Sequence, residues 1–129
     1  MTTEQILLYL LLAAVALFAL RRFVRVRSVK HYAASETAKK LAAAKDILLL
    51  DVRTPGEWKD QHIRGSLHIP LQELRHRLAE LKKYQQREII CYCRSGNRSL
   101  AAAALLKNHG FRAANMRGGI IEWNLSGLR

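Results

Sequence analysis

An uncharged, apolar segment near the amino terminus limits most strongly how this chain can fold. Residues 5–20 contain no charged side chain, and every residue of 6–20 is apolar. A helix over this segment has no polar face, and a basic cluster follows it at once at residues 21–27, which excludes a buried helix in the core of a soluble domain. Residues 5–20 form about 24 Å of helix at about 1.5 Å per residue, and their neighbours extend it toward the ~30 Å of a bilayer core. We therefore predict a single transmembrane helix whose residues 5–24 contact membrane lipid.

The charges that flank this segment predict its fate and its orientation. Glu4 precedes it, whereas arginines follow it at positions 21, 22, 25 and 27. A cleavable signal peptide is the alternative, because the apolar run is only moderately long and contains Ala-Val-Ala at residues 14–16. Signal peptides carry positive charge before the run, and here the charge follows it, which favours an uncleaved anchor. Because positive flanks stay in the cytoplasm, we expect residues 1–28 to anchor, in a single pass, a cytoplasmic domain of residues 29–129.

The rest of the chain alternates between strand and helix patterns. Residues 47–52 and 88–92 are largely apolar runs of the kind that form strands buried on both faces. Residues 71–84 carry leucines at helical spacing, and residues 99–108 form an alanine-leucine helix. We expect residues 29–34 to be a short linker. The alternation predicts an α/β domain with a central parallel sheet and helices on both of its faces.

Composition excludes several classes of function. The only cysteines, Cys91 and Cys93, are too far apart in an extended strand for a disulfide, so a reducing compartment is favoured. The net charge is +12, but no long basic run or aromatic-interleaved basic motif accompanies it. This pattern indicates a solvated basic surface, and we expect no specific nucleic-acid partner. The histidines show no metal-ligand spacing, so neither a metal nor another cofactor is predicted.

Chemistry is predicted where the strand at residues 88–92 ends. Cys93 is followed by Arg94, Ser95, Gly96, Asn97 and Arg98, and then by the alanine-rich helix. Such a loop can curl so that its N–H groups point inward, at a helix amino terminus that also favours negative charge. These donors stabilise the thiolate of Cys93, while Arg94 and Arg98 suit an anionic substrate. Cys91, still on the strand, is interpreted as a core residue, with a resolving thiol as the alternative.

Four motifs in order resemble those of the rhodanese-homology domain over about residues 35–125. They are residues 51–53 with 57–58, residues 62–66 with 69–70, residues 93–99, and residues 117–119 with Trp123. The resemblance implies a rhodanese-like three-layer α/β/α fold, preceded here by the transmembrane helix. It also implies a persulfide on Cys93, formed from thiosulfate or a related anionic donor and passed to a thiol or to cyanide.

Residues outside the loop are expected to support it. Asp51, Arg53, Glu57 and His62 belong to the resembling motifs, and we interpret them as structural residues around the site. We expect Asp51 to pair with an arginine or to cap the next turn.

Three hypotheses about function remain, and loop length separates two of them. Only four residues lie between Cys93 and Arg98, whereas phosphatases of this type have five, which favours sulfur over phosphate. Beside the sulfurtransferase hypothesis stand a phosphatase or arsenate reductase and a membrane-tethered interaction or persulfide-carrier module with little turnover of its own.

Overall fold

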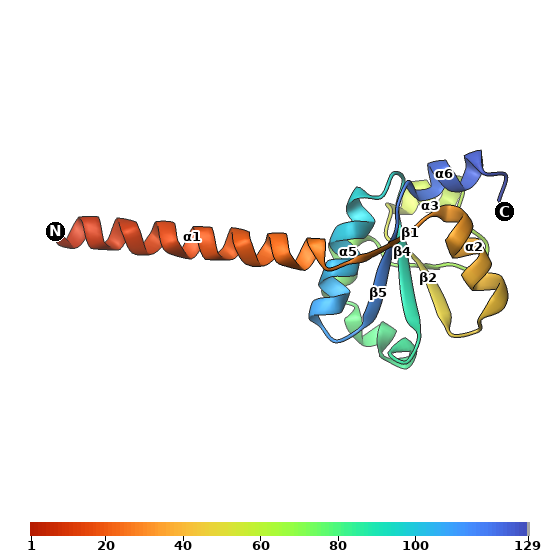
Figure 1. Ribbon diagram of the computed structural model, residues 1–129. Coiled ribbons are helices and arrows are strands. Elements are labelled where there is room, and N and C mark those ends of the chain that lie inside the picture. The colour runs from red at the N-terminus through yellow and green to blue at the C-terminus, as the bar shows by residue number, and fades with distance from the viewer. Residues whose placement is uncertain (129) are drawn as a thin grey trace.

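A computed structural model describes residues 1–128 (Figure 1). Its elements, in chain order, are α1 (Thr3–Arg27), β1 (Lys30–Tyr32), α2 (Ala34–Ala43), β2 (Ile47–Asp51), α3 (Pro55–Asp60), β3 (Leu67–His68), α4 (Leu71–Leu74), the 3₁₀ helix η1 (Leu78–Tyr84), β4 (Glu88–Tyr92), α5 (Asn97–Asn108), β5 (Arg112–Met116) and α6 (Gly119–Leu125).

The strands form one parallel sheet in the order β1-β5-β4-β2-β3. Every residue of β4 is buried, as are four of the five residues of β2, because both strands lie inside the sheet with side chains packed on both faces. This position inside the sheet explains why both strands have nearly continuous apolar sequences. The predicted α/β fold with a central parallel sheet is confirmed.

Successive residues of each strand face opposite layers of helices. Leu48, Leu50 and Cys91 pack with residues of α4, η1 and α5 on one face. Leu49 and Ile90 pack with residues of α2 and α6 on the other. Figure 1 shows α5 and α2 on opposite sides of the sheet.

Two expectations about local structure were wrong. Residues 29–34 are not only a linker, because β1 pairs with β5 in the register Lys30 to Ala114. Its side chains are mostly exposed, so the strand is formed by backbone hydrogen bonds at a sheet edge and leaves no apolar pattern. Residues 71–84 do not form one helix. The N–H groups of His76 and Arg77 donate three residues back, which tightens the chain between α4 and η1 while the leucines stay in the core.

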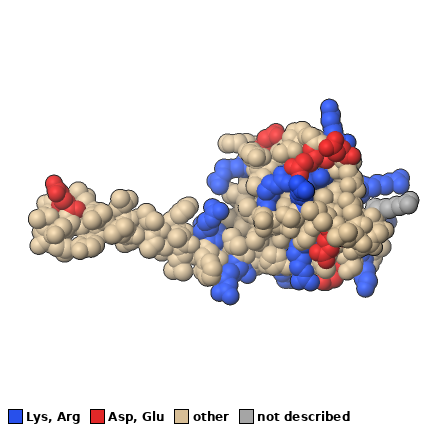
Figure 2. Space-filling view, turned by 90° about the horizontal axis from the view of Figure 1, so that it is seen from above, with Lys and Arg blue, Asp and Glu red and all other residues tan. Residues whose placement is uncertain are grey.

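Helix α1 projects away from the domain, and none of its residues is buried (Figure 1). Thr2 caps it, since its hydroxyl accepts from the Gln5 N–H at 3.3 Å and its own N–H donates to the Gln5 side chain at 3.0 Å. The helix is long and apolar enough to cross a membrane. Figure 2 shows an uncharged surface along most of its length and basic side chains where it meets the domain.

Candidate active site

The sulfur of Cys93 lies beneath the loop that connects β4 to α5. Gly96 has a φ of +111°, a left-handed conformation that turns its N–H toward the sulfur. This N–H donates to Cys93 Sγ at 3.1 Å, and the Ser99 hydroxyl lies 3.3 Å from the same atom. Cys93 is 1% exposed, whereas its neighbours Arg94 and Ser95 are exposed. The loop therefore surrounds the sulfur with hydrogen-bond donors, in the manner of an anion-binding nest.

The carbonyl groups of the loop point the other way and are bound by α6. The N–H of Ile120 donates to Cys93 O at 2.9 Å, and the N–H of Ile121 donates to Arg94 O at 3.3 Å. Gly119 makes this contact possible: its φ is +58°, and a Cβ there would lie 2.5 Å from Cys93 O and closer still to Arg94 O. The glycine pair that ends the resembling motifs thus lets α6 hold the loop.

The two cysteines have opposite electrostatic settings. Burial raises the pKa of the Cys93 thiol, but hydrogen bonds from the Ser99 hydroxyl and from the N–H groups of Ser99, Gly96 and Ser95 hold that pKa below its ordinary value. Cys91 is fully buried within β4, and burial raises its pKa far above the ordinary value, with the neighbouring Cys93 adding to the effect. Of the two thiols, Cys93 has the lowered pKa and Cys91 the raised one, so a thiolate forms more readily at Cys93 than at Cys91.

Arg98 is paired within the protein. Its Nη1 and Nη2 donate to the two carboxylate oxygens of Glu57 at 2.6 Å and 2.9 Å. The hydrogen bond from Arg98 is the largest cause that lowers the pKa of Glu57 to about 2, so this bridge persists at every physiological pH. Arg94, by contrast, is exposed and forms no ion pair with residues 1–128. Of the two loop arginines, Arg94 is the one whose charge is not offset.

A second arginine pair lies at the end of β2. Arg53 Nη2 donates to Asp51 Oδ2 at 2.7 Å and also to the carbonyl of Gln61. Asp51 is 0% and Arg53 4% exposed, so each buried charge is compensated by that of its partner. Asp51 therefore pairs with an arginine, as the sequence suggested. The pair connects the end of β2 to the end of α3 (Pro55–Asp60), the helix that carries Glu57.

His62 lies on the surface against Trp58. The two rings stack with centroids 3.6 Å apart, and His62 Nδ1 lies 2.9 Å from Trp58 O. These contacts fit the structural role expected for this histidine.

Asn115 and His31 were not singled out from the sequence. Asn115 lies on β5 and contacts Ser99, and through its amide it also reaches His31 on β1. No local pattern marks either residue, since only the pairing of β1, β5 and β4 brings them to the loop.

Comparisons with known proteins identify the family to which this site belongs. Residues 34–126 match the rhodanese-like domain family. A sulfurtransferase from Allochromatium vinosum is 41% identical over 92 residues, which are 70% of this chain and 84% of that protein. Thiosulfate sulfurtransferase PspE from Escherichia coli is 30% identical over 71 residues, 55% of this chain and 68% of that protein.

Solved structures agree with the sequence comparisons. A rhodanese-related protein from Thermoplasma volcanium superposes with a TM-score of 0.71 at 30% identity, over 78% of this chain and 95% of that chain. Several other curated relatives are longer, and this chain spans between 21% and 45% of their length. Relatives named as sulfurtransferases support sulfur transfer of the rhodanese type in general. Because the match covers the sheet from β2 to β5 together with the loop at Cys93, the chain belongs to the rhodanese-like domain family.

Proposed function

We propose that this protein transfers a sulfane sulfur from thiosulfate, or a related anionic donor, to a thiol or to cyanide through a persulfide on Cys93. The thiolate attacks the outer sulfur of the donor, and a new S–S bond forms to Cys93 Sγ. The S–S bond of thiosulfate breaks, and its electron pair leaves with sulfite. No proton is consumed, because the charge of the thiolate passes to the outer sulfur of the persulfide. The acceptor then attacks that sulfur and restores the thiolate.

The observation that carries this proposal is the donor set around one sulfur. Cys93 Sγ accepts from the Gly96 N–H at 3.1 Å and lies 3.3 Å from the Ser99 hydroxyl. Hydrogen-bond donors that α5 and α6 hold in place stabilise a thiolate. They can also bind an anionic substrate such as thiosulfate. In this proposal, residues 94–98 bind the anion, and the exposed guanidinium of Arg94 attracts it.

The remaining predicted site residues hold the loop in place. The Arg98–Glu57 bridge connects the start of α5 to α3, and the Asp51–Arg53 pair fixes the other end of α3. Because Glu57 neutralises Arg98, the anion-binding loop carries less positive charge than its sequence suggests. His62 contributes through its stacking on Trp58, without a part in the chemistry.

Mass spectrometry after exposure to thiosulfate tests the proposal against both rivals. We expect the intact protein to gain one sulfur, to lose it on addition of a thiol or cyanide, and to turn over repeatedly. Uptake without turnover would favour the alternative of a persulfide-carrier module, and one relative from Bacillus subtilis is named as a putative sulfur carrier protein. Hydrolysis of a phosphate ester at a comparable rate would contradict the argument from the short loop.

We also propose that residues 1–28 anchor the domain of residues 29–129 on the cytoplasmic side of a membrane. The arginines that follow the apolar run support this orientation, because positive flanks stay in the cytoplasm. A cavity of about 440 Å³ lies between α1 and α5. Apolar side chains of both helices line it together with arginines at positions 21, 22, 25 and 75. None of these arginines forms an ion pair within residues 1–128. Such a junction suits the boundary between acyl chains and anionic headgroups.

Deletion of residues 1–28 tests the anchor. The full chain should sediment with membranes and resist carbonate extraction, and the shortened chain should stay in the supernatant. Replacement of Leu10 and Leu12 by arginine is a matched variant that keeps the length of the chain. Each charge near the helix centre costs about 3 kcal/mol of insertion free energy, so this variant should also stay in the supernatant. A mature protein beginning soon after residue 16 would instead identify a signal peptide.

A further inference from the structure

Two acceptors compete for one hydrogen at the centre of the site. Ser99 Oγ lies 3.3 Å from Cys93 Sγ and 2.6 Å from Asn115 Oδ1. A serine hydroxyl has a single hydrogen to donate, and a thiolate and an amide oxygen both accept. When Cys93 is a thiolate, Ser99 can therefore satisfy the sulfur or Asn115, but not both.

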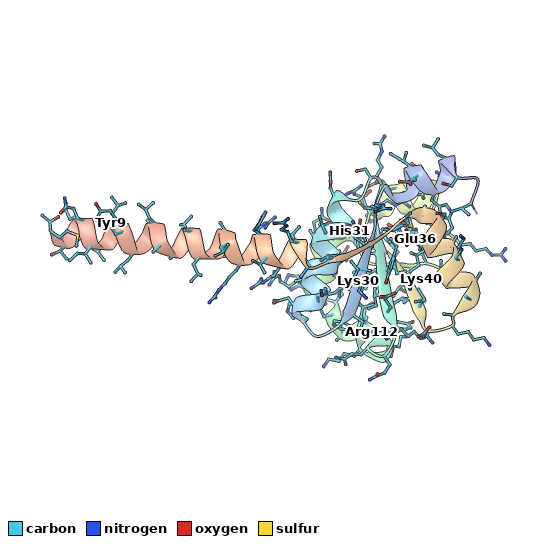
Figure 3. The ribbon with its side chains drawn as sticks, viewed as in Figure 1. Tyr9, Lys30, His31, Glu36, Lys40 and Arg112 are labelled. Atoms are coloured by element: carbon cyan, nitrogen blue, oxygen red, sulfur yellow. The ribbon has the colours of Figure 1, made fainter. Side chains whose placement is uncertain are left out.

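The orientation of the Asn115 amide follows from its other partners. Its Nδ2 donates to the Gly96 carbonyl at 3.3 Å and lies 3.2 Å from Nδ1 of His31, on the edge strand β1. Figure 3 shows where His31 lies on that strand. A carbonyl group only accepts, so Nδ2 must face it, and Oδ1 must face Ser99. Asn115 is 3% exposed, so its oxygen has little access to water when Ser99 turns away.

We propose that Asn115 is a positioning residue that governs whether Ser99 donates its hydrogen to the sulfur of Cys93. This inference rests on the proposed role of Cys93 as the nucleophile. In the free thiolate, Ser99 donates to sulfur, and the oxygen of Asn115 loses its donor. After sulfur uptake the negative charge lies on the outer sulfur, the inner sulfur is neutral, and Ser99 donates to Asn115 instead.

The competition has a consequence for both steps of the reaction. Because donation by Ser99 to the thiolate leaves the buried oxygen of Asn115 without a donor, the net stabilisation of the thiolate is smaller, and the thiolate is more nucleophilic. It also favours the persulfide relative to the free thiolate, since only in the persulfide are the inner sulfur, Ser99 and Asn115 all satisfied. Asn115 has no hydrogen bond to the sulfur itself: its Oδ1 acts on the sulfur through Ser99, and its Nδ2 holds the carbonyl of Gly96, whose N–H is the other donor to the sulfur.

The other ionisable groups near the sulfur, apart from His31, have no hydrogen bond to Asn115 within residues 1–128. They are Cys91 on β4, Arg98 on α5 with its partner Glu57 on α3, and Asp51 on β2 with its partner Arg53, while His31 lies at the far end of the amide. A change in the titration of Cys93 in an Asn115 variant then reports either the hydrogen of Ser99 or a shift of Gly96, and a Ser99→Ala background tells the two apart.

Alkylation of Cys93 by iodoacetamide as a function of pH, followed by peptide mass spectrometry, measures its pKa in the full chain. Asn115→Leu removes the competing acceptor at similar volume, and Asn115→Ala serves as a second variant. We expect the pKa of Cys93 to fall by about one unit, a roughly tenfold larger acid dissociation constant, because formation of the thiolate no longer leaves the buried oxygen of Asn115 without a donor. The attack of the thiolate on thiosulfate should slow by roughly threefold, because nucleophilicity falls with pKa.

Two controls separate this effect from a loss of packing. Ser99→Ala should raise the pKa of Cys93, and in that background Asn115→Leu should leave it unchanged. His31→Ala removes a partner of the same amide while Gly96 O still orients it, so the pKa should stay near that of the parent protein. An unchanged or raised pKa in a folded Asn115→Leu protein would overturn the proposal, as would an equal fall without Ser99. Alkylation needs no sulfur donor, so a parent protein that takes up no sulfur would contradict the proposed function alone.

Discussion

Cys93→Ser is expected to abolish sulfur uptake from thiosulfate and to lower turnover by at least on the order of 10³-fold, since the covalent route is lost. The donors from Gly96 and Ser99 lie around position 93, and a serine hydroxyl there remains protonated at neutral pH. The substituted chain should stay folded, because the change keeps the size of a buried side chain nearly constant. Intact mass after thiosulfate and the rate of sulfite release measure the two effects.

Cys91→Ala is the matched control for this substitution. Cys91 is 0% exposed in the middle of the sheet, where its raised pKa keeps it a neutral thiol. Its removal should cost about 1 kcal/mol of unfolding free energy and leave persulfide formation intact. A folded Cys91→Ala protein without turnover would make Cys91 a resolving thiol. Sulfur uptake by Cys93→Ser would contradict the assignment of the nucleophile altogether.

Gly119→Ala is expected to disrupt the site through the backbone of the loop. A Cβ at this position would overlap the carbonyl oxygens of Cys93 and Arg94, which accept hydrogen bonds from the start of α6. The residue also has a φ of +58°, which by itself costs a residue with a Cβ about 1–2 kcal/mol. Because the overlap is with backbone, the loop and α6 must separate. We expect a loss of at least about 2 kcal/mol in unfolding free energy and a large fall in sulfur transfer.

Gly127→Ala isolates the conformational part of that effect, so that the remainder at Gly119 is the steric part. Gly127 has a φ of +71°, but a Cβ there would meet nothing within 4 Å. It should therefore show the conformational cost, about 1–2 kcal/mol in urea unfolding, with sulfur transfer unchanged. Equal behaviour of the two alanine variants would show that α6 does not hold the loop through Gly119.

The sequence predicted the parts of the fold that bury apolar surface in a regular pattern. Residues 47–52 and 88–92 were expected to be buried strands, and β2 and β4 lie within the sheet. The leucines of 71–84 were recognised by their helical spacing, and they lie in or against the core, although two short helices carry them in place of one. Side-chain burial has a periodicity that can be recognised locally, whereas the hydrogen-bond spacing of a turn depends on what packs beneath it. Strand β1 was missed because pairing through the backbone leaves no mark on side chains.

For the candidate site, the sequence alone predicts a nucleophile, its loop and the order of motifs around it. Cys93 follows a buried strand and precedes a helix, and this local arrangement is enough to predict a thiolate among N–H donors. Only the tertiary structure decided how the charges and hydrogens of the site are shared. It neutralises Arg98 with Glu57, 41 residues away, and it places Asn115 of β5 against Ser99. Such partnerships depend on which strands and helices become neighbours, because hydrogen bonds and ion pairs act over a few ångströms between residues far apart in the chain.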